Sequence, residues 1–308
     1  PDAFVGKPPA VGTDAFAMET GNSSSAGPSF DANFDVDFSL LQQPWSAGTD
    51  WRAFSRSTSL RSLATNTPNA EVSETNNTSD YNNGIGHSYT AVWQSWMWKR
   101  HAGFDVLTYV GDGVAGRQLP HSMNNAPEMV WIKLRDRNNH NWCVGHKGLD
   151  GGTNPWQKFM YLNTADGEAD QTWPWNDTAP TANHLVLGNG GIVNGDADPF
   201  IAYLFASVEG ISKVDFWIGD GTNNRQITLG FQPRFLLVTL ANQGGGYGWQ
   251  MMDSWRGFIS PNNNILRLNN NNANSNQDTY FTPTATGMTI TESAFNGSNQ
   301  NWIYYAHA

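Results

Sequence analysis

The hydrophobic positions of this chain come in short runs that are separated by clusters of turn-forming residues. Residues 104–110 are β-branched and aromatic, and a Gly-Asp-Gly triplet follows them at 111–113. Such a triplet is typical of a hairpin turn. Residues 129–134 form an apolar run, which predicts a strand buried on both faces. Residues 286–291 alternate polar and apolar side chains, as a half-buried strand does. No stretch carries the period of an amphipathic helix longer than one or two turns, so the pattern predicts an all-β protein.

The same pattern of runs and turns occurs twice in the second part of the chain. Residues 109–118 read Tyr-Val-Gly-Asp-Gly-Val-Ala-Gly-Arg-Gln, and residues 217–226 read Trp-Ile-Gly-Asp-Gly-Thr-Asn-Asn-Arg-Gln. The match continues in the same order through 127–134 with 233–240, Trp142 with Trp249, 159–163 with 265–269, 180–187 with 283–290, and 200–206 with 302–308. Shared order and spacing over this length indicate an internal repeat.

A third and weaker copy fills the first hundred residues. It is traced by residues 16–23 at the hairpin position, 36–41 followed by Trp51, 60–63, and 89–96 at the closing strand. We therefore expect domains at 1–100, 101–210 and 211–308, each a β-sandwich or jelly-roll-like unit of about 100 residues. With 14 Trp, 16 Phe and few charges, the chain should have a surface rich in aromatic residues, which predicts self-association or docking to partner proteins. The alternative is that the three tandem repeats form one pseudo-threefold unit within the chain. Because the third copy ends on its last strand, we expect Ala308 to lie close to the true C-terminus.

Composition and charge narrow the classes of function. Lys and Arg number 17 and Asp and Glu 27, which gives a net charge of −10, and charged residues make up only 14% of the chain. An acidic chain without a basic block repels a phosphate backbone, so nucleic-acid binding is not expected. No apolar run reaches the length of about 18 residues that membrane insertion needs. Cys143 is the single cysteine, which excludes an intrachain disulfide and predicts an inert core thiol.

The chain has no specific catalytic motif. It lacks a Gly-x-Ser-x-Gly elbow, a His-Glu-x-x-His pair and a phosphate-binding glycine loop, so we expect no enzyme activity and no cofactor. Asp112 and Asp220 recur in the Gly-Asp-Gly triplets, where turn chemistry explains them. The carboxylate pairs at 35/37 and 196/198 are weak candidates for calcium, and the histidines have no metal-ligand spacing. We therefore expect no metal site, although calcium binding stays open.

The tryptophans fall into two groups. Trp51, Trp142 and Trp249 recur at one repeat position, which predicts core packing. A second group lies in a polar loop of the second copy only, where aromatic rings beside an amide and a carboxylate form a candidate platform for stacking a sugar. The four candidate residues are Trp173, Trp175, Asn176 and Asp177. The alternative is a loop whose aromatic rings pack against a neighbouring module or chain.

Several of these segments together resemble a known family. Tyr-Val-Gly-Asp-Gly at 109–113, followed by Pro-Glu-Met-Val-Trp-Ile-Lys-Leu-Arg-Asp at 127–136, is similar to a repeat of virion proteins from tailed bacteriophages, many of them marine or cyanobacterial. Residues 175–181 and 200–214 are shared as well. The resemblance covers the second and third copies, and its relatives are described as tail-fibre-like or structural. It supplies no catalytic residue. The first copy departs from the pattern in its hairpin and at 94–100, so we expect it to attach to another virion component.

Three functions remain in order of preference. The first is a non-enzymatic virion structural protein, such as a tail fibre, appendage or head decoration on the particle surface, which contributes to host attachment. The resemblance then implies other virion proteins as partners and a homotrimer. If the protein binds a host ligand, the loop at 173–177 predicts that this ligand is a host-surface glycan. The second is an extracellular carbohydrate-binding β-module protein, and the third is a polysaccharide depolymerase with a pair of carboxylates in a cleft.

Overall fold

The chain folds as an all-β protein, as its sequence pattern predicts. The computed structural model describes residues 6–22, 27–58, 61–74, 77–78, 81–87, 92–259 and 262–308. Its described helical segments are one-turn pieces, namely η1 (Gly12–Asp14), η2 (Arg56–Thr58), η3 (Leu149–Gly152), η4 (Pro155–Gln157), α1 (Gly191–Asn194) and η5 (Ser293–Phe295). Everything else that is regular is antiparallel β-structure.

Three large sheets hold most of the strands, and they share one topology. The first has the order β1 (Phe16–Thr20), β9 (Gln94–Trp98), β3 (Phe38–Gln42), β4 (Arg52–Ser55), β5 (Arg61–Leu63), β6 (Val72–Ser73). The second has the order β10 (Phe104–Val110), β17 (Pro199–Phe205), β12 (Met129–Leu134), β13 (Cys143–His146), β14 (Lys158–Tyr161), β15 (Ala169–Asp170). The third has the order β18 (Ser212–Ile218), β27 (Asn301–His307), β20 (Phe235–Leu240), β21 (Gln250–Asp253), β23 (Asn262–Arg267), β22 (Phe258–Ile259), and β24 (Ser275–Asp278) also pairs with β23. In each sheet the last long strand of the repeat lies between the first two.

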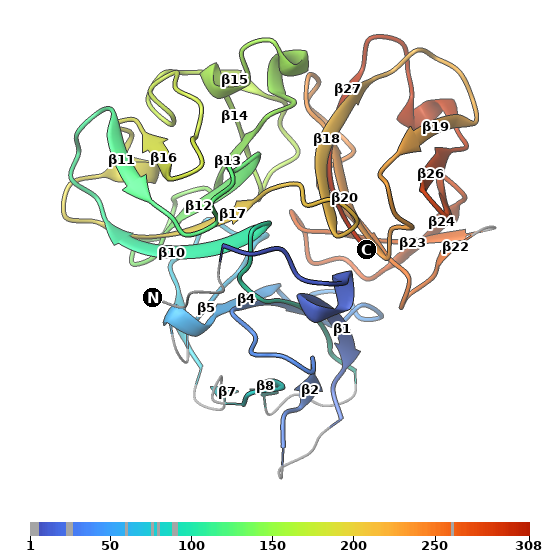
Figure 1. The fold of residues 1–308 in the computed structure, drawn as a ribbon, viewed down its shortest axis with the longest axis horizontal. Helices are drawn as coiled ribbons and strands as arrows, with labels where there is room; N and C mark the ends of the chain where they lie inside the picture. The colour runs from blue at the N-terminus through green and yellow to red at the C-terminus, as the bar shows by residue number, and fades with distance from the viewer. Residues whose placement is uncertain are drawn as a thin grey trace.

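Each large sheet is accompanied by a small one, which makes a sandwich-like lobe. The small sheets are β2 (Phe30–Asp31), β8 (Gly84–His87) and β7 (Asn77–Thr78) in the first lobe, β11 (Arg117–Pro120) and β16 (His184–Leu187) in the second, and β19 (Arg225–Thr228), β26 (Gly287–Ile290) and β25 (Phe281–Thr284) in the third. Figure 1 shows the three lobes arranged around a common centre. The sequence segments at Leu60 and at 89–91 lie outside the described residues.

The three large sheets turn one face toward a single shared core. Along β17, Ile201, Tyr203 and Phe205 point into this central core, whereas Ala202 and Leu204 point into the core of the second lobe. Strands of the first and third sheets alternate in the same way. Both faces are therefore buried, which explains why β12 is apolar along most of its length. The repeats are not independent domains, because they share this central core and form one pseudo-threefold unit within the chain.

The three recurring tryptophans close this unit into a ring. Each indole Nε1 donates a hydrogen bond to a backbone carbonyl of the neighbouring lobe: Trp51 to Arg267 O at 3.0 Å, Trp142 to Ala64 O at 2.9 Å, and Trp249 to Tyr161 O at 2.9 Å. The backbone N–H of each tryptophan donates to an asparagine of its own lobe, namely Asn66, Asn163 and Asn269. All three indoles are buried, as the repeat predicts, and they join the lobes in a cyclic order.

The aromatic content of the chain is used mainly inside the molecule. Eleven of the fourteen tryptophans are buried, Trp173 is half-buried, and only Trp45 and Trp255 are exposed. The expectation of self-association relied on a surface rich in aromatic residues. That premise is not met, because the rings serve the cores of the lobes and the centre of the ring.

Candidate functional site

Trp175 cannot serve as a sugar-stacking residue, and this part of the predicted platform is wrong. Its side chain is 0% exposed and belongs to the core of the second lobe. The indole Nε1 donates to Lys158 O at 3.1 Å, and the ring meets Trp156 edge to face at 5.6 Å. Gly145 lies directly against the same ring, so a side chain at that position would collide with it. The alternative interpretation, packing, is correct for Trp175.

Trp173 is half-buried and forms one wall of an open hollow of about 300 Å³. The hollow is lined by Tyr161, Trp173, Gly190, Gly191 and Ile192. Its walls are mostly apolar, and one of them is an indole. An indole face that is reachable from solvent can pack against the apolar face of a sugar ring. This hollow is the part of the predicted platform that the geometry can use.

Glycines let the chain pass close beside Trp173. Gly190 donates its backbone N–H to Trp173 O at 3.1 Å, and a side chain at Gly190 would overlap the indole. Gly188 donates to Pro174 O at 2.9 Å and approaches the Trp173 carbonyl equally closely. Phe159 packs against the Trp173 indole, with ring centroids 4.7 Å apart. The glycines at 188, 190 and 191 were the available signal in the sequence, whereas nothing in the sequence marks Tyr161 or Ile192.

Asn176 and Asp177 shape the loop rather than line the Trp173 hollow. Both have left-handed backbone angles, with φ of 52° and 49°. Asn176 donates its backbone N–H to Thr172 O at 2.8 Å, and Thr172 Oγ1 donates to an Asp177 carboxylate oxygen at 3.2 Å. Asp177 lines a second, smaller hollow of about 160 Å³ with Asn154, Pro155, Trp156, Gln157 and Ala179. The four predicted residues therefore do not converge on one ligand position.

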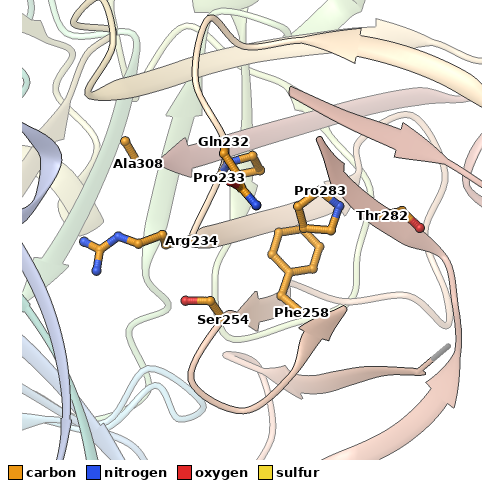
Figure 2. Close-up of a pocket in the computed structure, with 8 residues that line it drawn as sticks. All are labelled: Gln232, Pro233, Arg234, Ser254, Phe258, Thr282, Pro283 and Ala308. Atoms are coloured by element: carbon orange, nitrogen blue, oxygen red, sulfur yellow. The ribbon is translucent and has the colours of Figure 1, made fainter. Parts of the chain in front are cut away.

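The third lobe has a pocket of about 350 Å³ that the sequence did not indicate. It is lined by Gln232, Pro233, Arg234, Ser254, Phe258, Thr282, Pro283 and Ala308 (Figure 2). Phe258 and Pro283 face it, whereas the Arg234 side chain points away from them. The Arg234 guanidinium donates to Phe16 O at 3.0 Å and lies over the Phe16 ring. The one cationic group that lines the pocket, the Arg234 guanidinium, is therefore engaged in the contact between the third and first lobes.

The repeated Gly-Asp-Gly triplets do not form the predicted hairpins, because β10 and β11 lie in different sheets, as do β18 and β19. Each triplet instead makes a turn that joins a large sheet to a small one, and an asparagine clamps this turn. Asn296 Nδ2 donates to the Asp220 carboxylate and to Thr222 O, and its Oδ1 accepts from Arg225. Asn194 makes the same set of bonds to the second-lobe triplet, including one to Asp112 at 2.9 Å. Hydrogen bonds within each turn lower the pKa of both aspartates. The Val114 N–H contributes most at Asp112, and Thr222 contributes most at Asp220. The aspartates hold the turns, as the turn interpretation predicts.

The buried ionisable groups are engaged in the fold. Asp105 pairs with Arg100 at 2.6 Å, and Asp253 pairs with Arg256 at 2.7 Å in another lobe. Burial raises the pKa of the Cys143 thiol, as an inert core cysteine requires. No group of three His, Cys, Asp or Glu that could hold a metal ion occurs among the described residues. None of the helical segments in the described part of the chain is long and apolar enough to cross a membrane.

The comparisons with known proteins place the chain in a family. A family model described as a domain of unknown function (DUF7483) matches residues 95–308. The match begins within β9 of the first sheet and covers the whole second and third lobes. No curated protein and no solved structure matches the chain. Since the matched segment is more than half of its length, the chain belongs to the DUF7483 family.

Proposed function

We propose that the protein is a non-enzymatic structural component of a tailed-phage particle, displayed on the surface as a tail fibre, an appendage or a head decoration. The observation that carries this proposal is the closed ring of three lobes around one core. Each lobe contributes a tryptophan to the neighbouring lobe, so unfolding one lobe exposes the others. Such a unit resists local opening, which suits the exterior of a particle.

A role without catalysis agrees with the state of the buried acids. A depolymerase needs two carboxylates about 5–9.5 Å apart that are free to act on the same bond. Asp105, Asp198 and Asp253 are each paired with an arginine. Asp253 lies in another lobe than the other two, and Asp105 and Asp198 lie at opposite ends of the β10–β17 pair. The polysaccharide depolymerase is therefore the least favoured of the three functions.

Contact with a host-surface glycan is the second part of the proposal. The hollow beside Trp173 offers one indole face and a wall of glycine backbone, which suits a single sugar ring. One such contact is weak, and many copies on a particle would supply avidity. The same hollow also favours the second candidate, an extracellular carbohydrate-binding protein, and only association with particles separates the two.

Purified particles decide between these functions. Mass spectrometry of gradient-purified virions should find the chain at a fixed copy number, and antibody labelling should place it on the particle surface. A protein that is absent from virions and present on or outside cells would refute the virion assignment. Light scattering of the purified chain measures its oligomeric state and therefore tests whether the chain forms the expected homotrimer.

The glycan contact is tested with a matched pair of variants. Gly190→Ala should push the Trp173 indole aside and weaken attachment to host cells, whereas Gly27→Ala, in the first lobe, has open space around its new methyl group and should leave attachment unchanged. Trp173→Ala should weaken attachment as strongly as Gly190→Ala does. Unchanged attachment in both Trp173→Ala and Gly190→Ala would remove the hollow from the proposal and leave the structural role.

A further inference from the structure

The pseudo-threefold symmetry provides an internal comparison, because equivalent positions in the three lobes carry the same structural demands. Where one lobe departs from the other two without a structural need, the departure points to function. One such departure is at the junction where the third lobe meets the first. We infer that this junction is a second carbohydrate-binding site, which takes a neutral oligosaccharide between Trp45 and Trp255.

The first difference is in a row of three cross-strand neighbours whose side chains face the central core, one row in each large sheet. In the second sheet the row contains Thr108, Ile201 and Lys133, and in the third sheet it contains Phe216, Ile303 and Thr239. The corresponding row of the first sheet is entirely polar and contains Thr20, Gln94 and Gln42. The middle residue of the row is thus a buried isoleucine in two lobes and a glutamine in the first.

Gln94 is not explained by packing. Its side chain shares a face of β9 with Trp96 and Trp98, which lie in the central core. The residue is only 3% exposed, and its Nε2 has no hydrogen-bond partner among the described residues. A buried donor without a partner costs about 1–3 kcal/mol, which the isoleucines of the other lobes avoid. A ligand hydroxyl that enters beside it would satisfy this donor.

The two exposed tryptophans flank the same junction. Trp255 follows β21 and is 53% exposed, and its indole Nε1 donates to Thr20 Oγ1 of the first lobe at 3.1 Å. Thr20 is the cross-strand neighbour of Gln94, so Trp255 lies at the polar row. The equivalent of Trp255 in the second lobe, two residues beyond the end of β13, is Gly148. The lobe structure therefore does not demand a tryptophan there.

Trp45 reaches the junction from the first lobe. It is 67% exposed and follows β3, at a position that is Asp136 in the second lobe and Asn242 in the third. Its loop is fastened to the third lobe, because Asn274 donates its backbone N–H to Pro44 O at 2.5 Å. The Asn274 side chain accepts from Arg256 Nη1 at 2.8 Å, and Arg256 is the neighbour of Trp255. One chain of contacts thus links the two tryptophans.

The chemistry of this surface favours a neutral sugar chain. Two indoles can pack against the apolar faces of sugar rings, and amide side chains pair with hydroxyls as both donors and acceptors. Arg256, the cation next to Trp255 in the sequence, is already paired with Asp253 at 2.7 Å. A net charge of −10 also disfavours an anionic ligand. The site is separate from the Trp173 hollow and does not depend on the virion assignment.

The test uses the full chain and four neutral probes: maltohexaose, cellohexaose, mannohexaose and chitohexaose. Titration calorimetry and tryptophan fluorescence should show binding of at least one, with a blue shift as exposed indoles become covered. Trp255→Ala and Trp45→Ala should each lower the affinity about tenfold, which corresponds to a loss of ~1.4 kcal/mol. Val110→Ala, which changes an exposed apolar side chain of the second lobe outside both candidate sites, is the matched control and should leave this binding unchanged.

Gln94→Leu separates a binding role from a structural one. Removal of an unpartnered buried donor should leave the melting temperature unchanged or raise it, while the affinity for the probe falls. The inference is overturned if none of the four probes binds, or if binding is lost in Trp173→Ala and retained in Trp255→Ala and Trp45→Ala. It is also overturned if the chain is a dimer that Trp255→Ala dissociates, since the surface is then an interface between two copies.

Discussion

Acid should weaken the fold through His146, which is fully buried between the second and third lobes. Gly148 donates its N–H to His146 Nδ1 at 3.0 Å, and His146 Nε2 donates to Tyr304 O at 3.2 Å. These partners require the neutral ring, because a proton on Nδ1 would face the Gly148 N–H. Burial lowers the pKa of His146 from its ordinary value of 6.5 to about 3.

The sign and size of the effect follow from this lowered pKa. Between the two pKa values the unfolded chain binds a proton that the folded chain does not, so stability falls as the pH falls. The contribution is fully present above about pH 6.5 and is lost progressively toward pH 3. At pH 5, which is about 1.5 units below the unfolded pKa, the loss from His146 is about 2 kcal/mol. His307, whose pKa burial also lowers to about 3, adds a similar loss.

The assay is urea unfolding at pH 7 and at pH 5 for the wild type and for His146→Gln. Glutamine can donate to Tyr304 O but does not titrate, so the free energy lost between the two pH values should shrink by about 2 kcal/mol. His140→Gln, a change in a surface loop, is the matched control and should keep the wild-type difference. The reasoning is refuted if His146→Gln keeps the wild-type difference, or if the ring signals of His146 in NMR shift between pH 7 and pH 5 in the folded protein.

Three further predictions concern the ring of tryptophans, the Asn296 clamp on the turn after β18, and the loop at Trp173 and Trp175. Trp249→Phe should lower the free energy of unfolding by about 1–3 kcal/mol, because a carbonyl of the second lobe loses its donor. Trp255→Phe is the control and should change the free energy of unfolding by less than about 0.5 kcal/mol. Equal effects of the two variants would argue against the ring of lobes. Asn296→Ala should cost about 2 kcal/mol and loosen the turn between β18 and β19, seen as faster hydrogen exchange there, and unchanged exchange would contradict the clamp. Trp175→Ala should cost about 3–5 kcal/mol in thermal or urea unfolding, whereas Trp173→Ala should cost far less, and equal losses would place both rings in the core.

The fold class and the repeat follow from the sequence because they depend on local signals. Strand runs, glycine turns and a period of two are properties of neighbouring residues, and residues 109–118 and 217–226 match by inspection. The assembly of the lobes could not be derived in this way. Trp51 and Arg267 meet across 216 positions, and no local pattern states that a recurring tryptophan bonds to the next lobe rather than to its own.

The candidate site was predictable only in part, for a similar reason. Trp173 and Trp175 have the same loop chemistry, yet one lines a hollow and the other fills a core. The difference depends on Trp156 and Gly145, which pack against the Trp175 ring and belong to other segments of the lobe. The sequence also could not show that Gln94 replaces an isoleucine of the other two lobes, because the equivalent positions can be recognised only from the register of the three sheets.

The position of the closing strands also sets an order in which the chain can fold. Since β9, β17 and β27 each lie between the first two strands of their large sheet, no sheet can complete its pairing before the end of its repeat has left the ribosome. The first lobe must then wait longer, because the Trp51 donor finds its carbonyls only in the third lobe. Such distant contacts make folding slow relative to a helical protein of equal size. A nascent chain arrested after the second lobe should therefore hold a folded but open pair, with the surfaces that await the third lobe exposed to chaperones.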